Sequence, residues 1–176
     1  KHLIFTSVAL TIMIVISTLK IELIMKFVIP LFTVSFILLA IVPIIGVEVK
    51  GAKRWIDLYF FRLQPIEILK PFFILITAKL LTFEKFQNSQ IKYIFSFMLL
   101  GSVVILLINQ PDLGQSILLI GSWVSTVFIS GVSLIYIFAI FLIFSILLSS
   151  LLFFLPEKFG YIINRLITFF DRSQVD

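Results

Sequence analysis

The sequence predicts an all-α, polytopic transmembrane helix bundle. Of its 176 residues, 61% are hydrophobic and only 13% are charged, against about 45–50% and about 25% in soluble globular domains. A soluble protein of this size could not cover its surface with so few charges, so we expect lipid to be its main solvent. The composition therefore excludes a soluble enzyme, a disordered chain and a nucleic-acid-binding module.

Six apolar runs come close to the length that crosses a bilayer, which is about 20 residues with a range of about 17–25. We expect membrane spans at approximately 3–19, 27–47, 66–83, 93–109, 113–131 and 133–155. The runs are apolar all round and do not alternate apolar with polar residues, so helices fit them better than barrel strands. The sequence therefore predicts six transmembrane helices.

Polar connections separate these spans. A charged turn lies at 20–26, a polar segment at 48–64, a second charged turn at 84–92, and tight reversals at Gln110–Gly114 and Ser130–Ser133. Six spans put both termini on one side of the membrane. A count of basic residues would place the side with 48–64 in the cytoplasm. Acidic residues are interleaved with those cations, as in a binding site, so hydropathy alone leaves the orientation open.

Charge and rare residues exclude further classes of function. The formal net charge is +5 (14 Lys and Arg less 9 Asp and Glu), which indicates anionic lipid or an anionic substrate as the partner. The chain has no cysteine and one histidine, His2, so it offers no disulfide, thiol nucleophile or histidine cluster for zinc. Without a glycine-rich phosphate loop, an ATPase is unsupported.

Two ionisable side chains fall inside the third expected span. Glu67 and Lys70 stand at i and i+3 just after Pro65, on one face of a helix. Ionisable groups in apolar spans cost a few kcal/mol each, so they are functional candidates by default. One interpretation is an intrahelical ion pair that lowers the insertion cost; the other is a charged lining of a cavity.

The reversal between the fourth and fifth spans carries two more polar candidates, Gln110 and Asp112. Pro111 and Gly114 predict a tight break there. One interpretation is that Asp112 caps the helix that follows. Counting spans, however, places Gln110 and Asp112 at the same membrane face as Glu67, so a shared polar site is the alternative.

A cluster of cations lies on the same face, within 47–58. Lys50, Lys53 and Arg54 fall within five residues, close to Trp55. Arginine offers a forked donor, lysine a point charge, and tryptophan an anchor at headgroup depth. The cluster suits a phosphate or pyrophosphate, or else a loop that grips anionic lipid.

These three clusters, in this order, resemble the SEDS family of bacterial peptidoglycan glycosyltransferases. Val49–Ile56 matches the family's Val-x-Gly-Ala-x-Arg-Trp-Ile, and Gln110–Gly114 matches Gln-Pro-Asp-Leu-Gly without change. Gln64–Lys70 matches Gln-Pro-Ser-Glu-x-x-Lys, with Ile66 in place of the small residue. Each motif alone is weak, but three in register are specific. The details look most like the cell-division branch, with the elongation branch as the second choice.

The resemblance also implies a topology. Family members have ten spans, and the six expected here resemble spans two to seven, so we expect this chain to be part of a longer one. On that mapping, 48–64, 110–114 and 156–176 face the periplasm, and 20–26 and 84–92 face the cytoplasm. The family's proposed catalytic Asp lies in a large periplasmic loop downstream of Asp176. The resemblance therefore implies no catalytic residue within this chain, and we expect the chain alone to be inactive.

The activity that the resemblance implies is polymerisation of lipid II, an undecaprenyl-pyrophosphate-linked disaccharide peptide, into septal glycan strands. It also implies a multi-pass protein of the bacterial cytoplasmic membrane, at the septum for the cell-division branch. The implied partners are a class B penicillin-binding transpeptidase and other division proteins, with no nucleic acid. No cofactor is certain; a divalent cation is conceivable, but no ligand spacing here establishes one. The candidate substrate-binding residues are Lys53, Arg54, Gln64, Glu67, Lys70, Gln110 and Asp112.

Two other functions stay open at this point. Charges within spans and broken helices also fit a flippase or transporter of the lipid-linked precursor. A non-catalytic membrane scaffold of the division machinery is the second alternative, and it would tolerate loss of the candidate side chains.

Overall fold

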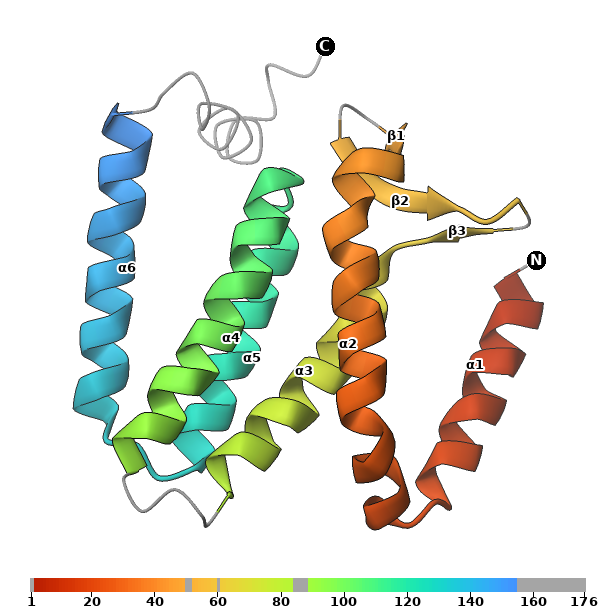
Figure 1. Ribbon diagram of the computed structural model, residues 1–176, viewed down its shortest axis with the longest axis horizontal. Coiled ribbons are helices and arrows are strands. Elements are labelled where there is room, and N and C mark those ends of the chain that lie inside the picture. Colours follow the sequence, from red (N-terminus) through yellow and green to blue (C-terminus); the bar gives the residue numbers. More distant parts are fainter. Residues whose placement is uncertain (1, 50–51, 60, 84–88, 155–176) are drawn as a thin grey trace. The chain divides into compact units, whose positions relative to one another are not determined.

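The computed structural model describes residues 2–49, 52–59, 61–83 and 89–154, which form six α-helices and three short strands (Figure 1). The helices are α1 (His2–Ser17), α2 (Ile21–Ile45), α3 (Pro65–Leu81), α4 (Ser89–Asn109), α5 (Leu113–Ile129) and α6 (Leu134–Phe154). Segment 156–176, Lys50 and Gly51 lie outside the described residues. The chain divides into two compact units between Ser130 and Gly131, and the candidate site lies within the first.

The core of the first unit is built from one apolar stripe on each of four helices. Helix α2 packs on α3, α3 packs on α4 and α5, and α4 packs on α5. The buried residues of each stripe recur every three or four positions, as the helical period requires. They include Val28, Phe32, Leu39 and Val42 of α2; Ile66, Leu69 and Phe73 of α3; Val103 and Leu107 of α4; and Leu119, Trp123 and Val127 of α5.

The outer faces of these helices are also apolar. Ile37 of α2, Ile105 of α4 and Leu118 of α5 are each more than half exposed. Among the described helices, Ile21–Ile45 and Gln90–Asn109 are long and apolar enough to cross a membrane. Helices that are hydrophobic on both faces suit a lipid environment, as the composition predicts.

Two of the predicted charged turns are shorter than the sequence analysis expects. Helix α2 begins at Ile21, so Glu22 and Lys26 lie in its first turns, and α4 begins at Ser89 and so includes Lys92. The expectation was wrong because it ended each helix where the apolar run ended. A helix end accepts charged residues, and Glu22 is favourable beside the positive end of the helix dipole.

Segment 48–64, expected only as a polar connection, contains an antiparallel sheet of order β1-β2-β3. Strand β1 (Val47–Val49) pairs with β2 (Ala52–Asp57), and β2 pairs with β3 (Arg62–Leu63). Strand β2 also packs against α2 and α3. The sheet therefore holds the predicted cation cluster against the end of the bundle.

Gly46 allows the sheet to fold back onto α2. A Cβ atom at this position would lie 2.4 Å from the carbonyl oxygen of Val42 and 3.3 Å from that of Trp55. A side chain would collide with the Val42 carbonyl, so the path by which the chain leaves α2 requires glycine, and the Trp55 carbonyl of β2 leaves little further room.

Candidate functional site

Strand β2 separates the two neighbouring cations of the predicted cluster. Because side chains alternate along a strand, Arg54 lies on the same face as the buried residues Ala52 and Ile56. Lys53 lies on the opposite face and is exposed. The structure therefore brings Arg54 into the bundle and leaves Lys53 outside it.

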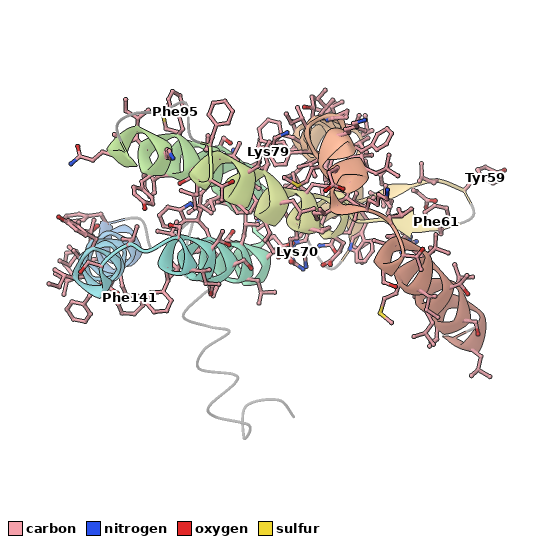
Figure 2. All side chains as sticks on the ribbon, turned by 90° about the horizontal axis from the view of Figure 1, so that it is seen from below. Tyr59, Phe61, Lys70, Lys79, Phe95 and Phe141 are labelled. Carbon is pink, nitrogen blue, oxygen red and sulfur yellow. The ribbon has the colours of Figure 1, made fainter. Side chains whose placement is uncertain are left out.

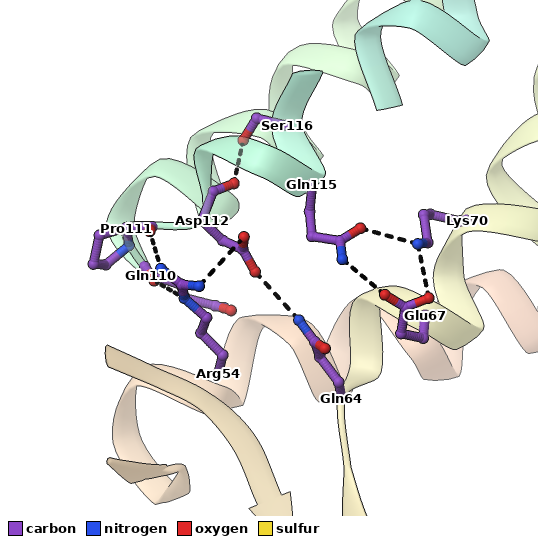
Figure 3. A network of polar contacts seen from close by, with 9 residues as sticks. All are labelled: Arg54, Gln64, Glu67, Lys70, Gln110, Pro111, Asp112, Gln115 and Ser116. Carbon is purple, nitrogen blue, oxygen red and sulfur yellow. Dashed lines mark hydrogen bonds and ion pairs between the residues drawn. The ribbon is translucent and has the colours of Figure 1, made fainter. Parts of the chain in front are cut away.

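The Arg54 guanidinium clamps the turn between α4 and α5 (Figure 3). Its Nε donates to the carbonyl oxygen of Gln110 at 3.2 Å, and its Nη2 donates to that of Pro111. Its Nη1 lies 3.6 Å from Oδ1 of Asp112, with the two side chains 21% and 8% exposed. One arginine thus binds three consecutive residues, which uses the fork of donors that lysine lacks.

Asp112 makes tertiary contacts and does not cap α5. It occupies the position before the helix, but its side chain forms no capping hydrogen bond. Instead, Oδ2 accepts a hydrogen bond of 3.2 Å from Nε2 of Gln64, at the start of α3. The capping interpretation is therefore wrong, because the carboxylate contacts Arg54 and Gln64 and not the backbone N–H groups at the start of α5. The break itself lies at Gln110–Asp112, since Gly114 is already helical.

Gln110 donates a hydrogen bond to a carbonyl of α2 that a proline leaves without its helical partner. Pro43 has no N–H, so the carbonyl of Leu39, four residues earlier, loses its helical partner. Nε2 of Gln110 donates to that oxygen at 2.8 Å. Gln110 is only 3% exposed, so this bond satisfies a carbonyl in an environment where an unpaired one is unfavourable. We call Arg54, Gln64, Gln110 and Asp112 the Asp112 network.

Glu67 and Lys70 form the ion pair that their spacing predicts, with Nζ 2.7 Å from Oε2. The pair is not isolated, because Gln115 of α5 contacts both partners (Figure 3). Nε2 of Gln115 donates to Oε1 of Glu67 at 2.7 Å, and Nζ of Lys70 donates to Oε1 of Gln115 at 2.9 Å. We call these three residues the Gln115 triad.

Gln115 is not among the site residues predicted from the sequence. The signal for it was present, since Gln115 follows Asp112 by three residues and three-residue spacing puts both on one helix face. The same spacing separates Gln64 from Glu67. The Asp112 network and the Gln115 triad are therefore successive layers between the first turns of α3 and α5.

The two layers differ in exposure. Asp112 and Gln110 are 6% and 3% exposed as whole residues, and both carboxylate oxygens of Asp112 already have partners. The Asp112 network is therefore suited to fix the positions of the helices, not to bind a ligand. The side chains of Glu67 and Lys70 are 50% and 25% exposed, so the triad is accessible to a ligand. The starts of two helices lie at the same place, and their partial positive charge favours an anion.

No group of three or more carboxylate, histidine or cysteine residues that could hold a metal ion occurs among the described residues. The divalent cation considered from the sequence stays a prediction. Of the seven predicted site residues, six are thus joined in two adjacent layers, and Lys53 is the one left apart.

The chain matches one family model almost throughout. The model, described as "Cell cycle protein" and covering FtsW, RodA and SpoVE, matches residues 1–175. A curated relative from Coxiella burnetii, named probable peptidoglycan glycosyltransferase FtsW, is 34% identical over 140 residues, covering 76% of this chain and 37% of the relative. An Aliivibrio salmonicida protein of the same name is 29% identical, covering 76% and 34%.

Solved structures share the fold. A chain from a study of the structural coordination of polymerization and crosslinking by a peptidoglycan synthase complex superposes with a TM-score of 0.77 at 26% identity, over 96% of this chain and 49% of that one. The D255A mutant of the Thermus thermophilus rod shape determining protein RodA superposes with a TM-score of 0.63 at 30% identity, over 76% and 46%. The predicted polytopic membrane helix bundle is thereby confirmed. This chain spans about a third of the length of the curated relatives.

Proposed function

Because the chain belongs to the cell cycle protein family of FtsW, RodA and SpoVE, we propose that it acts in peptidoglycan polymerisation and supplies part of the binding site for lipid II. Membership of this family confirms the resemblance on which the sequence analysis relies. The curated relatives are named probable peptidoglycan glycosyltransferase FtsW, which supports glycosyl transfer in peptidoglycan synthesis as the activity. We propose septal wall synthesis as its setting.

The observation that carries the proposal is the Gln115 triad. Lipid II joins an apolar polyprenyl tail to a disaccharide peptide through a diphosphate. A site for it needs a cation for the diphosphate, hydrogen-bonding groups for the sugars and an apolar surface for the tail. Lys70 supplies the cation, Glu67 and Gln115 supply the hydrogen-bonding groups, and the apolar outer faces of the helices supply the surface.

The Asp112 network has a positioning role in this proposal. Three of the five N–H donors of Arg54 already face the α4–α5 turn, so the arginine fixes that turn and does not itself bind pyrophosphate. Asp112 and Gln64 then set the distance between α3 and α5. The network keeps Gln115 opposite Glu67 and Lys70, one helical turn further along.

Glycosyl transfer breaks the bond between an anomeric carbon and its diphosphate. A sugar hydroxyl of one lipid II attacks that carbon, and undecaprenyl pyrophosphate leaves. The step needs a carboxylate base for the hydroxyl and positive charge for the leaving diphosphate. We assign the second requirement, positive charge for the leaving diphosphate, to Lys70.

The proposal extends to location and partner. We place the chain in the bacterial cytoplasmic membrane, with 48–64 and 110–114 at the periplasmic face, where lipid II is polymerised. A class B penicillin-binding transpeptidase is the proposed partner, because glycan strands must be crosslinked. The solved relative from a study of polymerization coordinated with crosslinking supports that pairing.

The test is a chimera in which this chain replaces the matching segment of Coxiella burnetii FtsW. We expect the purified chimera to convert lipid II into glycan strands in detergent. In a second measurement, we expect the chain itself to bind lipid II in nanodiscs. A flippase would move lipid II across vesicles and form no strands, and a scaffold would bind no lipid II. Either of these results would overturn the proposal.

A further inference from the structure

The hairpin of β2 and β3 ends in an exposed apolar tip. Tyr59 is 97% exposed, Phe61 is 53% exposed and Leu58 is 44% exposed. Figure 2 shows Tyr59 at the far end of the hairpin, which projects sideways from α2 and α3. Three large apolar side chains exposed at the end of a narrow projection are unfavourable in water, so a less polar environment than water would stabilise the tip.

The turn that carries the tip is firmly held. The backbone N–H of Leu58 donates to the carbonyl of Phe61 at 3.0 Å, and that of Tyr59 donates to Oδ1 of Asp57 at 3.0 Å. Tyr59 has a φ of 71°, a conformation that a bulky L-residue rarely adopts and that the surrounding bonds must maintain. Arg62 pairs with Asp57 across the strands at 3.7 Å. The hairpin therefore presents its aromatic rings from a fixed base.

The hairpin starts at the end of a membrane-crossing helix. Helix α2 has 25 residues, roughly 37 Å at 1.5 Å per residue, which is enough to pass through a hydrocarbon core of about 30 Å. Strand β1 begins two residues after α2 ends, and β2 packs on α2. The sheet is thus tied to headgroup depth, and Figure 1 shows it running across the axis of α2, not along it.

We propose that the tip side chains Leu58, Tyr59 and Phe61 insert into the headgroup region of the leaflet at which α2 ends. Tyrosine is enriched at that depth because its ring is apolar and its hydroxyl is polar. The base of the hairpin is charged, with Arg62 58% exposed in its side chain, and Lys53 is exposed on β2. Arg62 pairs with Asp57, and Lys53 lies opposite Glu48 across the strands, so the base carries balanced charges that belong in a polar layer. The headgroup region of a membrane accounts for both the apolar tip and the charged base, and α2 already lies in that membrane.

Spin labels at single cysteines test this directly, because the chain has no native cysteine. Tyr59→Cys, labelled with a nitroxide in phosphatidylethanolamine–phosphatidylglycerol vesicles, would be compared with Ile37→Cys on the outer face of α2 and Lys53→Cys on β2. Because the tip would lie at headgroup depth and Ile37 lies deeper, we expect the ratio of oxygen to nickel-chelate collisions for the Tyr59 label to be above that of the Lys53 label and below that of the Ile37 label. The Lys53 label should favour the nickel chelate.

A label at Phe61→Cys, with Tyr59 intact, provides a second reading in case the Tyr59 substitution disturbs the turn. We expect it to follow the Tyr59 label. Nickel access equal to that of the Lys53 label at both tip positions would overturn the proposal, and so would protection from both reagents, which would indicate cover by protein. Neither result depends on lipid II polymerisation, so the failure of the proposed activity would leave this test intact.

Discussion

Arg54 shows how a charged side chain is kept inside a mostly apolar bundle. A buried guanidinium loses its water, and that loss is offset only when protein acceptors replace it with good geometry. Gln110, Pro111 and Asp112 supply the acceptors from one turn of chain. Two of the three are backbone carbonyls at a helix end, which would otherwise lack partners. The guanidinium of Arg54 therefore gains acceptors in place of water, and the two backbone carbonyls gain a donor.

Arg54→Lys should destabilise the protein, because an ammonium group cannot reach the three acceptors at once. We expect a loss of about 1–3 kcal/mol in the free energy of unfolding, measured by denaturation in nanodiscs. The matched control is Lys53→Gln, one residue away and exposed, which should change stability by less than about 0.5 kcal/mol. Equal effects of the two substitutions would contradict the assignment of Arg54 as the clamp.

A second prediction concerns the hydrogen bond from Gln110 to the Leu39 carbonyl, which lacks its helical donor because residue 43 is proline. Gln110→Leu leaves the Leu39 carbonyl unpaired and should cost about 1–3 kcal/mol of stability. In a Pro43→Ala background, the new N–H of residue 43 restores the helical bond, so the same substitution should cost less. A double-mutant cycle measures the difference as a coupling of about 0.5 kcal/mol or more. Zero coupling would mean that the effect of Gln110 does not depend on the hydrogen bond that Pro43 fails to donate to the Leu39 carbonyl.

At the scale of elements, strand β2 decides which cation serves the site. From the sequence alone, Lys53 and Arg54 are equal candidates, because an irregular segment is expected there. Once the segment is a strand, the period of two sends them to opposite faces, with Arg54 beside the buried Ala52 and Ile56. The strand could not be anticipated from segment 48–64 by hydropathy, since its pairing depends on the approach of β2 to α2 at Gly46.

Gly46→Ala tests that approach. The added methyl group would meet the Val42 carbonyl at 2.4 Å and the Trp55 carbonyl of β2 at 3.3 Å. We therefore expect the backbone at the end of α2 to shift and to disturb the contact with β2, with a loss of more than about 1 kcal/mol in unfolding free energy. Gly101→Ala is the matched control, because a Cβ there meets nothing within 4 Å in the interior of α4. It should stabilise by about 0.5–1 kcal/mol. If both substitutions stabilise, the close approach is not required.

Across the whole molecule, the site depends on helices that start at the same end of the bundle. Span counting from the sequence predicts that Glu67, Lys70, Gln110 and Asp112 share a membrane face. In the structure, hydrogen bonds and ion pairs bring them into two adjacent layers. What the sequence could not supply are contacts made by backbone, such as the Leu39 carbonyl that accepts from Gln110. Those contacts depend on how far α2 and α4 are shifted along their axes relative to each other, which no local sequence pattern encodes.

The most direct test of the account is the affinity of the chain for lipid II in nanodiscs, with Lys70→Gln compared with Lys79→Gln at the other end of α3. Lys70→Gln removes the cation and leaves the Glu67 carboxylate without its ion-pair partner, so we expect binding to weaken by about tenfold or more, corresponding to about 1.4 kcal/mol. Lys70→Arg should recover much of it, and Lys79→Gln should bind as the unmodified chain does. Equal lipid II affinity for all four proteins would contradict the claim that the Gln115 triad holds the diphosphate.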